Sequence, residues 1–442
     1  MDEELQNNQT QEESTNNKKK RALKRVGAVA IGIGIFFAGG LAHYFTLDSE
    51  LRSLMRLKNR IQRSYYQEIT DEQFYSAALN GINGVLDAYS GYLSPEEYAK
   101  TLTQATGQQS GLGLSFSSTA TGAESLKILR VVGNSPAEEA GIVEGEYIVG
   151  YGATENDLEK KLDFISFSTF LADYEANETL YLKIRGVDGQ TRVLPIARKV
   201  YVENYVYYRT SDSAYAFSGD DALTAVERGT PLAALPQDTA YIRLESFNGN
   251  AAGEFAAAMN LFRMHNKKNL VLDLRGNTGG YLNIMLEIAS YFCKNTAEKK
   301  PIIALADYGE KKEAFAANGN YFSEYFLSTS RITVLADEYT ASASECLIGC
   351  MYDYGTISYQ DICLAKRNGV AKTFGKGIMQ TTFPLSVLDK DAVKLTTAKI
   401  CWPVSGNCIH GRGVLPDDGA LQAEENADFE VELQNCLSAL FS

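Results

Sequence analysis

Histidine is scarce in this sequence, with three residues in a chain of 442. His43 lies in an apolar run near the N-terminus, His265 follows an expected helix and His410 sits in a glycine-rich turn. Because a serine or cysteine nucleophile needs a nearby base at neutral pH, this scarcity disfavours a catalytic triad built on histidine. A desolvated lysine is an attested alternative base, so a serine enzyme with this sequence would have to use one.

The sequence also lacks a CxxC motif, and no histidine stands at ligand spacing from a pair of cysteines. We therefore expect neither a metal nor a cofactor. A thiol redox function through Cys346 and Cys350, one helical turn apart, is the weakest alternative. The seven cysteines cannot all pair with one another. We expect Cys401 and Cys408, which flank a hairpin-like turn, to be free thiols, with a disulfide in an oxidising exterior as the alternative.

An excess of basic residues is missing as well, since the formal net charge is −13. Binding to phosphates requires a basic face, so we expect no nucleic acid partner. Apolar residues make up 45% of the chain and charged residues 22%, which is ordinary for a globular protein. At this length we expect two or three domains.

Residues 26–45 contain no Asp, Glu, Lys or Arg, and a basic cluster at residues 18–25 precedes them. Such a run is long enough to span a bilayer, and flanking basic residues stay on the cytoplasmic side. We therefore predict a single-pass cell-membrane protein. Residues 1–25 would be a disordered cytoplasmic tail, residues 26–45 the anchor, and the catalytic domain would be extracytoplasmic. The alternative is a cleaved signal peptide, because Gly40-Leu41-Ala42 resembles a cleavage site, although the apolar run is longer than usual for one.

Three further regions follow from local patterns. Residues 46–106 show helical spacing and capping signals at Thr70 and Ser94, which predicts a helical N-terminal region. Residues 107–198 contain short apolar runs between Gly, Asn and Asp turns, which predicts a small β-rich domain. Residues 199–442 alternate strand and helix patterns, which predicts an α/β core with a β-rich C-terminal part and a closing helix.

The stretch TASASE, residues 340–345, stands where an expected strand at 332–336 meets an expected helix. The first N–H groups of a helix lack partners, so this junction can hold both a nucleophilic hydroxyl and donors to an oxyanion. Lys376, between two glycines and beside apolar residues, is the candidate base. The glycines within residues 276–280 follow a buried strand and permit close approach to a substrate carbonyl, with a plain tight turn as the alternative.

Seven motifs occur in order between about residue 51 and residue 418: YSGYLSPEEY, GLGLSF, NSPAEEAGI, LDLRGNTGGYL, TASASE, MYDYG and FGKGIMQ. This set resembles the carboxy-terminal processing (tail-specific) serine peptidases. The resemblance implies an α/β (α+β) multidomain protein with an N-terminal transmembrane helix, a helical stalk and a PDZ-like β module. It further implies a crotonase/ClpP-like α/β peptidase core with a β-rich C-terminal part, protein substrates bound by their C-terminal tails, and a candidate homodimer contact in the helical region.

The same resemblance assigns roles to single residues. Ser342 would be the nucleophile, Lys376 the general base and Gln380 the residue that positions the lysine. Asp353, on the helix after the nucleophile, is a candidate supporting residue, with a structural cap or salt-bridge partner as an equal alternative. The oxyanion donors would be backbone N–H groups. These donors are expected at Ala343 and at either Gly279 or Gly280.

A stretch of four residues resembles the carboxylate-binding loop of a PDZ module: Gly111, Leu112, Gly113 and Leu114. Their N–H groups would capture a terminal carboxylate while the tail adds to a sheet edge. The stretch SPAEEAG at residues 135–141 resembles the short helix of that module. Glu144-Gly145-Glu146 departs from the Pro-Gly-Asp of the family and keeps the acidic residue.

Two of these assignments have rivals. The segment between Gly355 and Phe374 is longer than the family pattern and adds Lys366 and Lys372, but only Lys376 has the glycine-flanked setting. Ser344 is the rival nucleophile. We therefore predict a membrane-anchored serine endopeptidase that recognises C-terminal tails and cleaves with a Ser–Lys dyad. The alternative is a proteolytically inactive tail-binding envelope scaffold.

Overall fold

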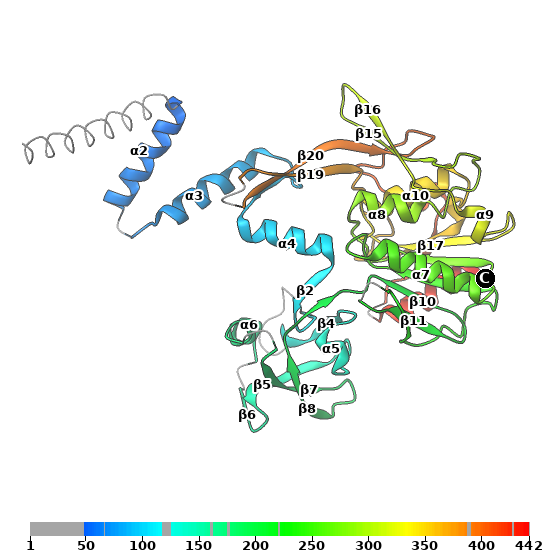
Figure 1. Cartoon of the computed structure of the whole chain (residues 1–442), viewed down its shortest axis with the longest axis horizontal. Helices are drawn as coiled ribbons and strands as arrows, with labels where there is room; N and C mark the ends of the chain where they lie inside the picture. Colours follow the sequence, from blue (N-terminus) through cyan, green and yellow to red (C-terminus); the bar gives the residue numbers. More distant parts are fainter. Residues whose placement is uncertain are drawn as a thin grey trace, which may run out of the picture. The chain divides into compact units, whose positions relative to one another are not determined.

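The computed structural model describes residues 48–65, 67–116, 125–159, 162–174, 177–219, 222–386, 390–426 and 428–441. The chain divides into two compact units, Met1–Val85 and Leu86–Ser442 (Figure 1). The tail predicted at 1–25 and the anchor predicted at 26–45 lie outside the described residues. Within the part that is described, no helix combines the length and the apolar character needed to cross a bilayer.

The described part of the first unit is helical. It contains α2 (Ser49–Ser64), α3 (Asp71–Asn80) and the 3-10 helix η1 (Gly81–Val85). Thr70 begins α3 with a reciprocal cap: its Oγ1 accepts from the Gln73 N–H at 3.1 Å, and the Gln73 Oε1 accepts from the Thr70 N–H at 3.0 Å. The predicted capping signal at Thr70 is therefore confirmed.

The second unit begins with a short strand and a capped helix, β1 (Gly91–Leu93) and α4 (Pro95–Thr106). Ser94 caps α4 and Pro95 occupies its first turn, as predicted. Strand β1 pairs with β20, the central strand of a five-stranded antiparallel sheet. The other strands of this sheet and their bounds are β15 (Ile302–Asp307), β16 (Lys312–Ala316), β19 (Ile378–Pro384) and β20 (Ala392–Cys401).

A small β-rich region follows, which we call the β-rich domain. One sheet has the order β6-β5-β7-β8, and β3 pairs with β4 in a second. Strands β2 and β9 pair with each other where the chain enters and leaves this domain. The bounds are β2 (Gln108–Gly111), β3 (Leu114–Phe116), β4 (Ile128–Val131), α5 (Pro136–Glu139), β5 (Tyr147–Thr154), β6 (Asp157–Glu159), α6 (Phe164–Ala172), β7 (Thr179–Arg185), β8 (Thr191–Ala197) and β9 (Lys199–Val202).

The α/β core is an eight-stranded sheet of order β12-β11-β10-β13-β14-β17-β18-β21, parallel from β13 onward. The strands are β10 (Val206–Arg209), β11 (Ala214–Phe217), β12 (Ala225–Glu227), β13 (Thr239–Leu244), β14 (Asn269–Asp273), β17 (Ile332–Ala336), β18 (Ile362–Ala365) and β21 (Leu421–Ala423). The helices are α7 (Ala251–Met264), α8 (Leu282–Ala289), α9 (Phe322–Tyr325), α10 (Ala343–Asp353) and α11 (Phe429–Phe441), with short 3-10 helices η3 (Tyr359–Asp361) and η4 (Pro416–Asp418).

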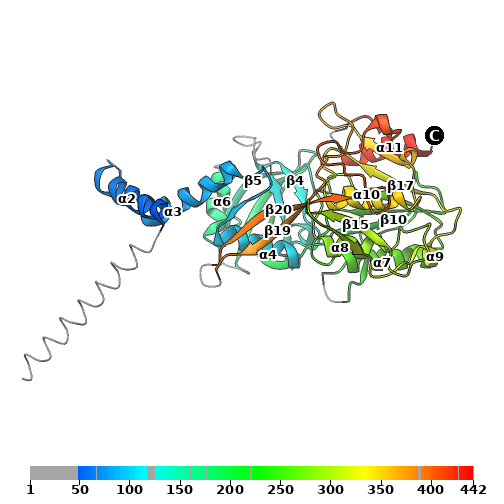
Figure 2. The same ribbon diagram turned by 90° about the horizontal axis from the view of Figure 1, so that it is seen from above.

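Both faces of this sheet are buried because side chains alternate along each strand. Leu270 and Leu272 of β14 pack with the helices α7, α8 and α10, whereas Val271 packs with α11. Figure 2 shows α11 on one side of β10 and β17, and α7 and α9 on the other. The continuous apolar runs predicted as buried strands are thus confirmed as central strands.

The register of the parallel strands creates the site. Asp273 at the end of β14 lies opposite Leu335 of β17, so the loops that follow both strands leave the same edge of the sheet. Ligands bind at such edges in α/β folds. The loop at residues 274–281 and the turn at 337–342 are therefore brought together.

All seven cysteines lie in described residues and all are free thiols. Cys346 and Cys350 are buried, as expected for one face of α10. Cys401 is buried and Cys408 is exposed, and the alternative disulfide between them is not formed.

Candidate active site

Ser342 occupies the turn between β17 and α10 with a backbone that L-residues rarely adopt. Its φ is +59° and its ψ is −114°, and it is the residue that immediately precedes α10. Gly279 faces it closely: a Cβ at position 279 would lie 2.8 Å from Ser342 Cβ and 3.0 Å from Ala343 N. Such strain is found where a side chain is held in a special orientation. Ser342 is half-buried and lines a cleft of about 490 Å³.

Ser344, the rival nucleophile, has a different environment. Its side chain is fully buried and its hydroxyl donates to the Asn277 carbonyl at 3.0 Å. Ser344 is not among the described residues that line the cleft. This bond connects the start of α10 to the glycine-rich loop at residues 276–280.

The three predicted oxyanion donors differ in their partners. The Gly279 N–H donates to Asn277 Oδ1 at 2.9 Å, so it is already used. Among the described residues, the N–H groups of Ala343 and Gly280 have no hydrogen-bond acceptor, and both residues line the cleft. Gly280 has a φ of +147°, and a Cβ there would lie 2.4 Å from the Phe247 carbonyl oxygen, so only glycine fits. Of the two glycines, Gly280 is therefore the one whose N–H group is available to bind an oxyanion.

Glu345 connects the two candidate catalytic segments. It is fully buried, and its carboxylate accepts from the Ser342 N–H at 3.1 Å and from the Lys376 N–H at 2.8 Å. Thr373 Oγ1 and the Gly375 N–H, each at 2.6 Å, complete its partners. Burial raises the pKa of this carboxyl, and the four donors oppose that rise. Glu345 belongs to the TASASE motif, but its role as a link to the segment at 373–376 does not follow from the motif alone.

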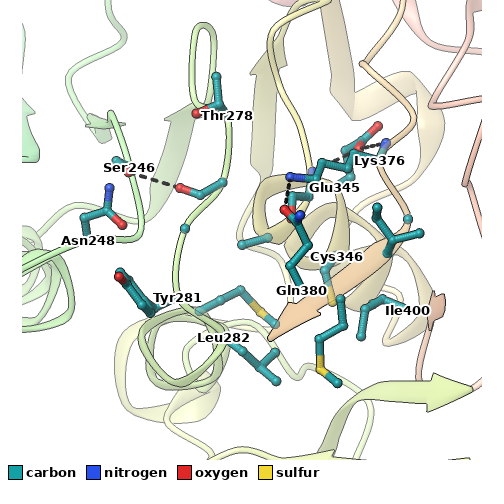
Figure 3. Close-up of a pocket in the computed structure, with 18 of the residues that line it drawn as sticks. Ser246, Asn248, Thr278, Tyr281, Leu282, Glu345, Cys346, Lys376, Gln380 and Ile400 are labelled. Carbon is teal, nitrogen blue, oxygen red and sulfur yellow. Dashed lines mark hydrogen bonds between the residues drawn. The ribbon is translucent and has the colours of Figure 1, made fainter. Parts of the chain in front are cut away.

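Lys376 lies in the cleft with its amine directed at Gln380 (Figure 3). The Lys376 Nζ donates to Gln380 Oε1 at 2.7 Å and lies 5.1 Å from the centre of the Tyr89 ring. The Gln380 Nε2 in turn donates to the Tyr89 carbonyl, which fixes the amide orientation. In the described part of the chain, no hydrogen bond joins Lys376 Nζ to Ser342 Oγ. Tyr89 belongs to the YSGYLSPEEY motif, and no pattern in the sequence places it beside Lys376.

The environment of Lys376 favours the uncharged amine. Burial is the largest cause lowering the pKa of Lys376, and the positive charge of Lys394 is the second. The two rival lysines have other surroundings: Lys366 forms an ion pair with Glu424 at 3.6 Å, and neither Lys366 nor Lys372 belongs to the described cleft residues. Of the three candidate lysines, only Lys376 shares the cleft with Ser342.

The cleft combines a polar and an apolar part. Figure 3 shows Lys376 and Gln380 on one side of the view and Ser246 and Asn248 on the other, with the loop that carries Thr278 between them. Its apolar lining consists of Leu282, Met285, Cys346, Ile378, Met379, Ile400, Trp402 and Ile409. Such a surface suits an apolar substrate side chain next to the reacting groups.

Asp353 belongs to a different structure. Its Oδ2 accepts from the N–H groups of Val404 and Ser405, both at 2.8 Å, and from Ser405 Oγ at 3.1 Å. These bonds hold the turn after Trp402 against the end of α10. The contacts fit the structural alternative for Asp353 and bring it no contact with Lys376 or Ser342 among the described residues.

The predicted carboxylate-binding loop lies in the β-rich domain, at the start of β3. Gly113 has a φ of +82°, and a Cβ there would lie 2.1 Å from Ser135 Cβ, so the position requires glycine. The Leu112 carbonyl accepts from the Ala137 N–H at 2.9 Å, which ties the loop to α5. Among the described residues, β3 has one paired edge, the edge that faces β4.

No metal-binding group of three or more His, Cys, Asp or Glu is found in the described ranges.

Comparisons with known proteins agree on the core. The family model described as Peptidase family S41 matches residues 238–419. A probable CtpA-like serine protease of Staphylococcus saprophyticus is 27% identical over 391 residues, which cover 87% of this chain and 69% of the relative. A carboxyl-terminal-processing protease of Synechocystis sp. is 28% identical over 381 residues, which cover 84% of this chain and 77% of the relative.

Among solved structures, one named "Putative S41 protease" from Bacteroides fragilis has a similar fold. It aligns with a TM-score of 0.50 and 19% identity, over 85% of this chain and 90% of that chain. The mixed α/β architecture described above is therefore shared with an S41 protein.

Proposed function

The chain belongs to peptidase family S41 and is a serine peptidase, and on that premise we propose that it cleaves protein tails with Ser342 as nucleophile and Lys376 as general base. One observation carries this proposal. A single cleft contains the strained Ser342, the half-buried Lys376 and two backbone N–H groups without acceptors among the described residues, those of Ala343 and Gly280.

Peptide hydrolysis would proceed as follows. The neutral Lys376 amine takes the proton of Ser342 Oγ as this oxygen attacks the scissile carbonyl. The N–H groups of Ala343 and Gly280 stabilise the oxyanion, each by on the order of 3 kcal/mol. The Lys376 ammonium then protonates the leaving amine of the substrate. Lys376, now neutral again, next takes a proton from a water that hydrolyses the acyl-enzyme, and it returns that proton to Ser342 Oγ.

The first of these steps requires a movement of Lys376. Its amine donates to Gln380 at 2.7 Å, and among the described residues it is not hydrogen-bonded to Ser342 Oγ, so proton transfer needs the two groups to approach each other. Catalytic hydrogen bonds are often incomplete before substrate binds. Gln380, held by the Tyr89 carbonyl, would keep the amine in the cleft between turnovers.

Tail recognition is assigned to the β-rich domain. The loop at residues 111–114 would bind the terminal carboxylate, and the tail would extend along the free edge of β3. Support comes from the glycine-requiring backbone at Gly113 and from a cluster of aromatic rings, in which the centre of the Phe116 ring lies 5.8 Å from that of Phe164 and 5.9 Å from that of Phe167. This domain would act as a PDZ-like module.

Residues 26–45 would anchor the enzyme in the cell membrane, with the peptidase outside. This location remains a prediction from the apolar run and its basic flank. The homodimer contact in the helical region also remains a prediction.

Purified full-length protein in detergent, incubated with an unfolded protein that ends in an apolar tail, tests the function. We expect cleavage that stops in Ser342→Ala and in Lys376→Ala but persists in Lys372→Ala, the matched control. Blocking the substrate tail with a polar extension should slow cleavage. If the protein binds the tail but never cuts it, the inactive scaffold is the correct function. Cleavage retained in Lys376→Ala would overturn the assignment of the base.

A further inference from the structure

Lys394 is a second lysine in the same cleft, and the reaction described above does not use it. Strand β20 holds its backbone from both sides, since Lys394 pairs with Gly91 of β1 and with Thr382 of β19. Its side chain lines the cleft with Ser342 and Lys376. A side chain on a doubly paired strand is held more rigidly than one on a loop, which is what a recognition site requires.

Lys394 has no partner among the described residues. In that part of the chain its amine forms no ion pair or hydrogen bond, and the residue is half-buried. Glu345 is the one acidic residue among the described residues that line the cleft, and four donors already occupy its carboxylate. With Lys376 acting as a neutral base and Glu345 already occupied, no carboxylate among the described residues of the cleft is left to neutralise the Lys394 ammonium.

The register of the sheet sets the distance from Lys394 to the reacting groups. Gln380 pairs with Thr396, and the next pair on the same face is Thr382 with Lys394. Two residues along a strand advance roughly 7 Å. An extended substrate advances about 3.3 Å per residue, so the amine can reach a group within about three residues of the scissile bond.

We propose that Lys394 forms a carboxylate-binding subsite of the substrate cleft, so that the enzyme prefers peptides with a carboxylate within about three residues of the cleaved bond. This inference rests on the proposed peptidase function. The carboxylate is either an acidic side chain or the C-terminal carboxylate of a short tail. Both would form a charge-assisted hydrogen bond with the amine, next to the apolar lining that holds the neighbouring side chain.

The test uses full-length protein and fluorogenic peptides that share one apolar cleavage site. One series places Glu or Gln at each of three positions on either side of the bond, and a second series has an acid or an amide at the C-terminus. We expect one pair to differ about tenfold in kcat/KM in favour of the carboxylate. The ratio should fall to about one in Lys394→Met, return in Lys394→Arg, and stay unchanged in Lys399→Met, an exposed lysine of the same strand. Preference in the first series assigns an acidic side chain, and preference in the second assigns the terminal carboxylate.

A binding measurement separates this inference from the peptidase function. Fluorescence anisotropy of the same peptides with Ser342→Ala should show the same carboxylate preference, and Ser342→Ala/Lys394→Met should lack it. If no peptide is cleaved but this binding preference is found, the peptidase function fails and the subsite stands. Equal cleavage and equal binding of every carboxylate and amide pair, or a preference that Lys394→Met leaves undiminished in both series, would overturn the subsite; a terminal-carboxylate preference that Lys394→Met only reduces reflects the added contribution of the loop at residues 111–114.

Discussion

At the scale of single residues, the Lys376 amine experiences two opposing influences. Burial and the charge of Lys394 lower its pKa, whereas the Tyr89 ring at 5.1 Å favours the charged form. Gln380 is neutral, so it can hold the amine without adding charge. The proposed base must be deprotonated to act, so this balance would decide at which pH the peptidase works.

Gln380→Glu tests that balance. A carboxylate beside Lys376 stabilises the ammonium and raises its pKa, by about 1–3 units for close opposite charges. Because only the neutral amine acts as base, activity near pH 7 should fall at least about tenfold and recover at higher pH. The pH profile of kcat/KM checks this. Activity lowered equally at every pH would contradict an electrostatic role for Gln380.

Some residues of the candidate site could be predicted from the sequence, and others could not. Ser342 and Lys376 could be predicted because each stands in a local motif. Tyr89 could not, because its contact with Gln380 joins positions 291 residues apart in the chain. Glu345 stood in the motif itself, yet its role follows from bonds to the segment at 373–376 that only the folded chain reveals.

At the scale of elements, local patterns located most helices and strands. Strand β17 has the predicted bounds, residues 332–336, because its apolar run and both ends are local features. Strand β20 runs from Ala392 to Cys401, and pairing with β15 holds its C-terminal end. Helix α8 ends at Ala289, since the chain turns there with Phe292 N–H bonded to the Ala289 carbonyl at 2.9 Å.

Helix α10 packs against the only tryptophan of the chain. A Cβ at Gly349 would lie 1.9 Å from Trp402 Nε1, and Trp402 lines the cleft. Gly349→Ala should therefore lower the free energy of unfolding by about 1–3 kcal/mol and change the Trp402 emission. Denaturant unfolding checks this. Adding Trp402→Leu should remove most of the loss, and fully additive effects of the two substitutions would contradict a direct clash.

Helix α7 carries a buried carboxyl, that of Glu254. It accepts from the N–H groups of Tyr205 and Val206, and burial raises its pKa to about 8. In the unfolded chain the carboxyl ionises near its ordinary pKa of 4.5, so stability is greatest below that pH and is lost as pH rises toward about 8.

Glu254→Gln should remove this pH dependence. Between pH 5 and pH 8 the wild type should lose a few kcal/mol of unfolding free energy that Glu254→Gln retains. Glu287→Gln, at an exposed glutamate of α8, is the control. Unfolding by denaturant at several pH values measures the effect. If the unfolding free energies of wild type and Glu254→Gln changed in parallel with pH, the Glu254 carboxyl would have the same pKa in the folded and unfolded states, which would contradict this prediction.

At the scale of the whole molecule, charged residues join the β-rich domain to the α/β core. Arg130 Nη2 contacts Glu203 Oε1 at 2.8 Å and Glu245 Oε2 at 2.6 Å. Arg228 Nη1 contacts Glu138 Oε2 at 2.7 Å. The Arg130 pairs connect the candidate tail-binding domain to Glu245, which follows β13 and leads into the cleft, and the Arg228 pair connects it to the end of the edge strand β12.

Arg130→Met should loosen this connection, because it leaves the carboxylates of Glu203 and Glu245 without their shared cation. We expect about tenfold faster amide hydrogen exchange in β2 and β9, which border the β-rich domain. Arg192→Met is the matched control, since Arg192 pairs with Glu146 inside that domain. Equal exchange in both variants would contradict a role for Arg130 in joining the two parts.

The central claim is that Ser342 attacks with the help of a neutral Lys376. The most direct measurement is the rate at which a serine-directed covalent probe labels the full-length protein across pH, with the labelled peptide identified by mass spectrometry. The account predicts label on Ser342, a rate that rises with pH through one titration, and no label in Lys376→Ala although its Trp402 emission is native. Label on Ser344, or labelling of Ser342 at an undiminished rate in Lys376→Ala, would contradict it.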